Sequence, residues 1–304
     1  GPFLSLIEGN ELTVEFENLL NEPTTIHWHG IKNLNEMDGV PNLTQAPIEP
    51  GETFIYKFPV NNSGTFWYHA HNKAWEQVSR GLYGPLIVKE KSNTSFDKDI
   101  TLVADDWRLN KDYQFDEKSL GSLMDWSHQG RLGNWLTING ETNPIITIKN
   151  NCHLRLRIIN ASNARILNFK LDNYQASIIA LDGEPCTPFT KNSFQIAPAQ
   201  RIDLSIYIKN KNLILFETTS DKLLPTVKFL VKGNTRLNQG TNKFKLLKLR
   251  NNYPDVTNTE IIDIHMQGGA MGNLSSAIYK GKKKHFRELA SNHSKLWAFN
   301  KKVG

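Results

Sequence analysis

The feature that most constrains the fold is an alternation of apolar and polar side chains with a period of two residues. It runs through residues 12–16, 154–158 and 202–208, and short turn clusters rich in Asn, Asp and Gly separate such runs. Alternation places the apolar side chains on one face of a strand, and short runs of this kind are typical of β-sandwiches. Helical periodicity is weak, and the best short helices are expected near residues 72–80 and 284–290. The pattern predicts an all-β, mostly antiparallel fold.

The length of the chain indicates more than one domain. At roughly 150 residues per domain, 304 residues correspond to about two domains. A strand-like run gives way to charged and polar residues near Lys89–Asn93, and strand patterning thins after about residue 237. We therefore expect one domain over residues 1–92, a second over residues 93–236, and a C-terminal linker segment over residues 237–304.

Composition excludes several classes of partner. The chain has 36 Lys and Arg against 30 Asp and Glu, and its densest basic run, Lys280–His285, is expected to be a solvated loop. We therefore expect no nucleic-acid partner. No apolar run approaches the roughly 20 residues that cross a bilayer, so no membrane span is expected. The first residues do not have the pattern of a secretory signal, which is expected to be absent or to have been removed. The two cysteines, Cys152 and Cys186, exclude a dense disulfide framework, and we expect both to be free.

The chemistry is concentrated in two His-x-His pairs, His27/His29 and His69/His71. A chain with nine histidines is expected to contain on the order of 0.3 such pairs by chance. Side chains two apart on a strand share a face, so two neighbouring strands would direct four imidazoles at one volume. Imidazole suits copper, zinc, iron and nickel, and the pattern predicts a centre with more than one ion. The alternative, hydrogen-bonded histidines of a half-buried sheet, suits an isolated histidine better than this quartet.

The surroundings of these pairs resemble a known family. Residues 25–31, 37–41 and 64–71 are similar to the first domain of laccase-like, three-domain multicopper oxidases, and residues 80–88 resemble the strand that closes that domain. The second block resembles the middle domain of the same family, and the similar stretches are residues 139–140, 154–163, 181–183 and 197–203. The resemblance implies two cupredoxin-like Greek-key β-sandwich domains in tandem, followed by the linker segment.

The resemblance also implies roles for individual residues. By it, His27 binds the type 2 copper, and His29, His69 and His71 bind the two type 3 coppers. Asp38 matches an acidic residue that donates protons or orients water during dioxygen reduction, and the alternative is that it serves only as an Asp-Gly turn residue. The implied activity is oxidation of a small reducing substrate, a phenol or a metal ion, coupled to reduction of dioxygen to water. A periplasmic or secreted location is implied as well.

The departures from the family pattern limit this expectation. A type 1 copper needs a Cys thiolate with two histidines, yet Cys152 has only His153 beside it and Cys186 has no neighbouring histidine. The remaining ligands of the copper cluster are therefore expected from a missing third domain, in cis or on neighbouring subunits, and the isolated chain, taken as a fragment, is expected to be inactive. Two alternatives are a two-domain blue copper protein such as a nitrite reductase, which lacks support because no cysteine precedes residue 152, and a non-catalytic copper-binding or copper-handling cupredoxin.

Overall fold

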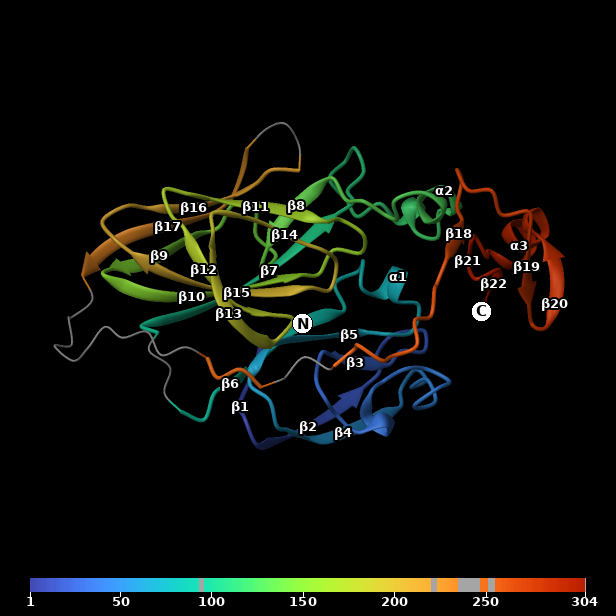
Figure 1. Ribbon diagram of the computed structural model, residues 1–304, viewed down its shortest axis with the longest axis horizontal. Coiled ribbons are helices and arrows are strands. Elements are labelled where there is room, and N and C mark those ends of the chain that lie inside the picture. Colours follow the sequence, from blue (N-terminus) through green and yellow to red (C-terminus); the bar gives the residue numbers. More distant parts are fainter. Residues whose placement is uncertain (93–95, 220–222, 235–246, 251–254, 304) are drawn as a thin grey trace. The chain divides into compact units, whose positions relative to one another are not determined.

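The computed structural model describes residues 1–92, 96–219, 223–234, 247–250 and 255–303 (Figure 1). Two compact units are present. The first contains Gly1–Trp107 and Gly133–Arg250, and the second contains Arg108–Leu132 and Asn251–Gly304. Strands dominate and helices are few and short, which confirms the all-β prediction.

The N-terminal part of the first unit is a small sandwich. A four-stranded sheet has the order β1-β6-β5-β3, and the antiparallel pair β2-β4 forms a second sheet. Trp28, Tyr56 and Phe66 are buried with other apolar side chains from both sheets. The elements are β1 (Leu4–Ile7), β2 (Asn10–Glu17), β3 (Ile26–His29), the 3-10 turn η1 (Asn35–Met37), β4 (Thr53–Val60), β5 (Gly64–Ala70), α1 (Ala74–Gln77) and β6 (Tyr83–Lys89).

The remainder of the first unit is a larger sandwich of two sheets, ordered β13-β12-β15-β10-β7-β8 and β14-β11-β16-β17-β9 (Figure 1). Leu156, Phe169 and Phe229 are fully buried in its core. The strands are β7 (Lys98–Trp107), β8 (Trp135–Ile138), β9 (Ile145–Asn150), β10 (Cys152–Asn160), β11 (Leu167–Asp172), β12 (Ala176–Leu181), β13 (Glu184–Lys191), β14 (Ser193–Ile196), β15 (Arg201–Ile208), β16 (Leu213–Glu217) and β17 (Leu224–Asn234).

A buried charge network joins the two sandwiches. Asp203 on β15 accepts hydrogen bonds from Arg155 at 2.7 Å and from Arg157 at 3.3 Å, both on β10. The Thr65 hydroxyl on β5 donates to Asp203 at 2.6 Å and accepts from Arg157 at 2.9 Å. The two arginines also pair with Glu90 and Asp99. Because buried charges must be paired, this network fixes β5 against the larger sandwich.

The second unit is more regular than its sequence pattern indicates. Residues expected within a linker form a five-stranded sheet, ordered β18-β21-β22-β19-β20, with Leu289 and Ala298 in a small core. Its strands have two to four residues, which is too short for an alternation to be recognised. The elements are the 3-10 turn η2 (Glu117–Ser119), α2 (Leu123–Ser127), β18 (Met266–Gly268), β19 (Ser276–Tyr279), β20 (Lys282–His285), α3 (Phe286–His293), β21 (Trp297–Phe299) and β22 (Lys302–Val303).

The structure also bears on the predictions for the basic run, the two cysteines and a membrane span. The basic run is not a loop, because Lys282–His285 is a strand of a hairpin with β19. Cys152 and Cys186 are both free, as expected. Among the described residues, no helix has the length and apolar character that crossing a membrane requires. The proposed boundary at residue 93 and the stretches 237–246 and 251–254 lie outside the described residues.

Candidate metal centre

The histidine pairs lie on two adjacent antiparallel strands. His27 on β3 is directly opposite His69 on β5, and His29 is opposite Trp67. His71 follows the end of β5, and its backbone N–H donates to the Thr25 carbonyl at 3.1 Å. Residues opposite each other in an antiparallel pair share a face, so the alternation puts all four imidazoles on the face away from the small core.

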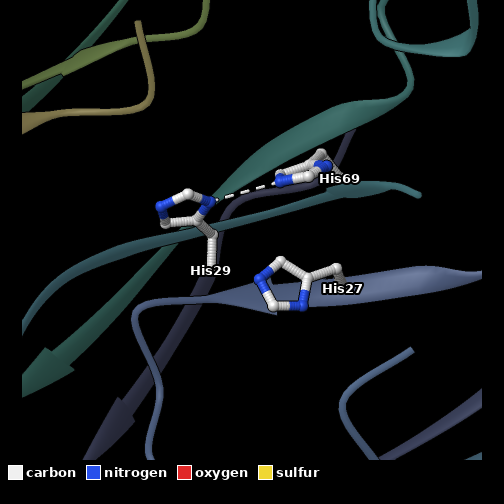
Figure 2. A group of neighbouring side chains, drawn as sticks. All are labelled: His27, His29 and His69. Atoms are coloured by element: carbon white, nitrogen blue, oxygen red, sulfur yellow. Dashed lines mark hydrogen bonds between the residues drawn. The ribbon is translucent and has the colours of Figure 1, made fainter. Parts of the chain in front are cut away.

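Three of the four imidazoles converge closely. One ring nitrogen from each of His27, His29 and His69 lies within 4.8 Å of the other two (Figure 2). Nδ1 of His29 and Nε2 of His69 are 3.3 Å apart, which is about the separation of two nitrogens bound at ~2.0–2.1 Å to one tetrahedral ion. The His71 ring is outside this group, but its centroid is 5.3 Å from that of His27. The structure therefore brings the whole predicted quartet together, with His71 slightly apart.

Local hydrogen bonds orient two of these rings. Nδ1 of His27 donates to the backbone carbonyl of Asp38 at 2.7 Å, and Nδ1 of His69 donates to the carbonyl of Ala70 at 2.9 Å. Each bond places the proton on Nδ1 and leaves the Nε2 lone pair for a cation. The carboxylate of Asp38 also lies near His27, with Oδ1 3.4 Å from Nδ1. Asp38 thus contacts the cluster while it also ends the turn η1.

Burial favours the neutral form of three imidazoles, those of His29, His69 and His71. Burial, followed by the charge of Arg201 and the neighbouring histidines, lowers the pKa of His29 to about 3. Burial lowers the pKa of His69 to about 4, and it lowers the pKa of His71 as well, with His27 adding to the effect. Metal ions bind the neutral ring. The cluster is therefore ready to bind a cation at neutral pH without first losing protons from these three residues.

Two glycines permit close approaches at this site. Gly39 has a φ of +75°, and a Cβ there would lie 1.8 Å from the carbonyl oxygen of Ile26, so the turn that carries Asp38 can lie against β3. Gly30 has a φ of +88°, and a Cβ there would lie 2.3 Å from the guanidinium of Arg201. Glycine is the residue that adopts such backbone angles without strain. Gly39 therefore lets the Asp38 turn pack against β3, and Gly30 lets the Arg201 guanidinium approach the end of β3.

Sequence reasoning missed two residues of the site. Trp67 is 4% exposed, and its ring centroid lies 4.5 Å from that of His69 and 5.4 Å from that of His29. Its position two residues before His69 on a strand was an available signal. The Arg201 guanidinium donates to the carbonyls of Thr65 and Asp182 and lies against Gly30. Its approach depends on the packing of the two sandwiches, which no local pattern reveals.

Comparison with known proteins agrees with this geometry. Family models described as multicopper oxidase match residues 1–93 and residues 98–233. The chain belongs to the multicopper oxidase family. The first matched segment contains all four histidines of the cluster and Asp38.

Individual relatives of this multicopper oxidase chain cover most of its length. Copper resistance protein A of Escherichia coli is 30% identical over 266 residues, which is 73% of this chain and 44% of that protein. A multi-copper oxidase structure from Pseudomonas thermotolerans has a TM-score of 0.80 and 31% identity, with 88% of this chain and 64% of that chain covered. The blue copper oxidase of Nitrosomonas europaea has a TM-score of 0.66 and 30% identity, with 76% of each chain covered.

The chain spans less than half of the length of that curated relative. The family implies copper, and the donor set fits that metal, because neutral imidazoles are good copper ligands and the 3.3 Å nitrogen separation suits a shared ion. Nothing in the donor set favours a hard, oxygen-seeking cation such as Mg²⁺ or Ca²⁺.

Proposed function

We propose that this chain supplies half of the ligands of a copper cluster at which a multicopper oxidase reduces dioxygen to water. The observation that carries the proposal is the convergence of His27, His29 and His69 within 4.8 Å, with His71 beside them. The electrons would come from a small reducing substrate, a phenol or a metal ion. Relatives named for copper resistance support a role in copper chemistry.

Within this proposal, His27 is the type 2 copper ligand, and His29, His69 and His71 are the type 3 ligands. The central place of His27 supports the assignment, since its ring lies 5.3 to 5.5 Å from each of the other three rings. Asp38 is the proposed acidic residue, because its carboxylate is at the edge of the cluster.

Bound copper would supply one-electron redox chemistry and a place for dioxygen to bind. The residues of the chain do the rest. Hydrogen bonds from Nδ1 of His27 and His69 hold the rings in their binding tautomer, the buried Trp67 ring shields one side from water, and Asp38 can hold a proton at Oδ1, 3.4 Å from His27.

The remaining parts of the centre are proposed to lie outside these residues. Four histidines are half of a trinuclear ligand set, so a third domain in cis or neighbouring subunits would supply the other half and the type 1 site. Cys152 is buried in an apolar core, which does not suit a blue copper thiolate. We also propose that residues 1–92 and 93–236 are the two domains and that residues 237–304 are the linker segment. The proposed location of the protein is periplasmic or secreted.

Oxygen consumption with a phenol as reductant tests this proposal. The copper-loaded chain alone should consume no oxygen and show no intense blue band, whereas the chain joined to a multicopper oxidase third domain should show both. Turnover by the chain alone, abolished by a chelator, would contradict the proposed incompleteness. Copper binding without oxygen consumption in either form would favour the alternative of a non-catalytic copper-handling protein.

A further inference from the structure

Six lysines that are far apart in the sequence gather at one end of the larger sandwich. The parallel strands β9 and β17 both end there, and Figure 1 shows their ends side by side. The parallel strands β10 and β7 begin there, and β15, antiparallel to β10, ends there. The start of β12 and the end of β13 complete this end of the sandwich. The lysines of this basic end are Lys98, Lys149, Lys191, Lys209, Lys211 and Lys232.

Hydrogen bonds between the loops hold the basic end together. The Asn150 side-chain amide donates to Oδ1 of Asn210 and, at 2.9 Å, to Oδ1 of Asn234. Oδ1 of Asn150 accepts in turn from the backbone N–H of Asn210 at 2.8 Å. The Tyr174 hydroxyl donates to the carbonyl of Lys211 at 2.7 Å. Because these bonds join four separate loops, the lysines that the loops carry belong to one surface.

The charges of the basic end are not neutralised by carboxylates. All six lysines are exposed, and the lysine ion pairs found among the described residues are formed by other lysines. Asp97 and Asp172 lie at this end, but each already accepts a local hydrogen bond. Oδ2 of Asp97 accepts from the backbone N–H of His153 at 2.8 Å, and Oδ2 of Asp172 accepts from the Asn173 amide at 2.7 Å. The basic end therefore carries an excess of exposed positive charge.

The small sandwich has the opposite charge. Residues 1–92 hold eleven Asp or Glu against six Lys or Arg. Glu15 and Glu17 on β2 are exposed and point away from the core of the small sandwich. A separation of charge of this kind orients a protein in the field of a charged surface. Near an anionic surface, the basic end should turn toward it and the β2 side should turn away.

The side chains of the basic end indicate what kind of anionic partner fits. Its loops, residues 149–151, 172–175, 209–212 and 232–234, contain no arginine and none of the large apolar side chains that are exposed in the described chain. Interfaces between folded proteins depend on aromatic and arginine anchors, and lysine is depleted in them. Lipid headgroups are mobile and gather around exposed lysines without fixed geometry. A lysine surface without anchors therefore suits an anionic lipid surface.

We propose that the basic end of the larger sandwich docks on an anionic lipid surface, with the β2 side of the small sandwich facing away. Each lysine near such a surface strengthens binding about fivefold, and salt screens the attraction. The contact is therefore reversible and peripheral. This inference goes beyond the proposed function and does not depend on copper, because no histidine of the cluster takes part.

The first test measures co-sedimentation of the chain with vesicles. The native chain should bind vesicles of phosphatidylcholine mixed with phosphatidylglycerol, should not bind pure phosphatidylcholine, and should detach as salt is added. Lys149→Gln/Lys211→Gln should weaken binding at least about tenfold. Lys282→Gln/Lys283→Gln removes the same charge from the second unit and should change binding less than about twofold. Equal weakening by both variants, equal binding to both kinds of vesicle, or no binding to the anionic ones would overturn the proposal.

The second test concerns orientation. Glu15→Gln/Glu17→Gln raises the net charge by as much as the lysine variant lowers it, at exposed positions of β2. If the β2 side faces away by more than a Debye length, this variant should change vesicle binding less than about twofold. Strengthening as large as the weakening seen for Lys149→Gln/Lys211→Gln would show a response to net charge alone and would overturn the oriented docking.

The third test asks whether a second copy of the chain is the partner instead. Light scattering without lipid at low salt should show single chains at every concentration. Growth in particle size that Lys149→Gln/Lys211→Gln abolishes would show that the acidic side of another copy binds the basic end, and it would overturn the lipid proposal. Vesicle binding by a chain that retains no copper would contradict the proposed function alone.

Discussion

Two antiparallel strand pairs of the first unit, β10/β15 and β3/β5, both place polar side chains at two-residue spacing on one face, but the two sets of side chains interact differently. On β10 and β15, Arg155, Arg157 and Asp203 occupy one face at two-residue spacing, and their charges close on one another at 2.7 to 3.3 Å. On β3 and β5, alternate positions carry imidazoles, which cannot neutralise one another and whose ring nitrogens converge. Opposite charges make a closed structural contact, whereas like donors leave lone pairs for a ligand.

Burial acts differently in the two regions. Burial alone raises the pKa of Asp203, but Arg155 and Arg157 outweigh it and hold that pKa below its ordinary value. No counter-charge offsets burial at His29 and His69, so their pKa values fall to about 3 and about 4. The first region is stable because it is charged and paired, and the second can bind a cation because it is neutral.

The largest expected effect is the loss of folding free energy when the buried ion pairs of Asp203 with Arg155 and Arg157 are broken. Asp203→Asn leaves Arg155 and Arg157 without their shared carboxylate, and breaking a buried ion pair costs about 3–5 kcal/mol of folding free energy. Urea unfolding should show this loss, while Asp112→Asn at an exposed site should cost less than about 0.5 kcal/mol. If Asp203→Asn lost no more folding free energy than the control, the claim that these buried ion pairs stabilise the fold would be contradicted.

The next largest effect is the pH dependence of folding stability that arises from His29 and His69 in the histidine cluster. Below pH 6.5 the unfolded chain protonates His29 and His69, whereas the folded metal-free chain resists protonation until about pH 3 and 4. Stability is therefore complete above pH 6.5 and is lost as pH falls toward 4, by about 2 kcal/mol between pH 6.5 and 5 after allowance for partial exposure.

Unfolding measurements on the native chain and on His29→Gln/His69→Gln check this expectation. The variant should have a clearly shallower slope over that window, because glutamine does not titrate and His71 is then the one group left with a pKa lowered by burial in the cluster. An equal slope in both proteins would mean that these two histidines do not set the pH response.

A smaller change should follow from displacing the turn beside β3. Gly39→Ala places a Cβ against the Ile26 carbonyl at a φ of +75°, so the turn must shift away and remove the Asp38 carbonyl from His27. Loss of such an orienting bond typically weakens metal affinity by about tenfold or more. Copper titration should show that loss, and Gly51→Ala, where a Cβ meets nothing within 4 Å, gives a control at another positive-φ glycine. Equal affinity in both variants would count against orientation by Asp38.

The smallest effect is expected from the Asp38 side chain. Because His27 donates to the backbone carbonyl rather than to the carboxylate, Asp38→Asn preserves the tautomer. Copper affinity of the metal-free chain should change only about two- to fivefold. A loss as large as that of Gly39→Ala would show that the carboxylate, and not the carbonyl, orients the ring.

The alternation in the sequence predicts the strands of both sandwiches well, since β2, β10 and β15 cover the alternating runs that it marks. It also predicts that His27 and His29 share a face. It cannot predict that Arg201 approaches Gly30, or that Asp203 meets Thr65, because those contacts depend on how separate sheets pack. The strands of the second unit were missed because two to four residues carry no measurable period.

The central claim is that the four imidazoles are ligands of one copper cluster. Copper content after dialysis of the loaded chain tests it directly, with His29→Ala/His71→Ala compared against His153→Ala/His265→Ala, whose histidines lie outside the cluster. The account predicts that the native chain and the control retain copper, and that the first variant stays folded but retains almost none. Copper retention by His29→Ala/His71→Ala equal to that of the native chain would contradict it.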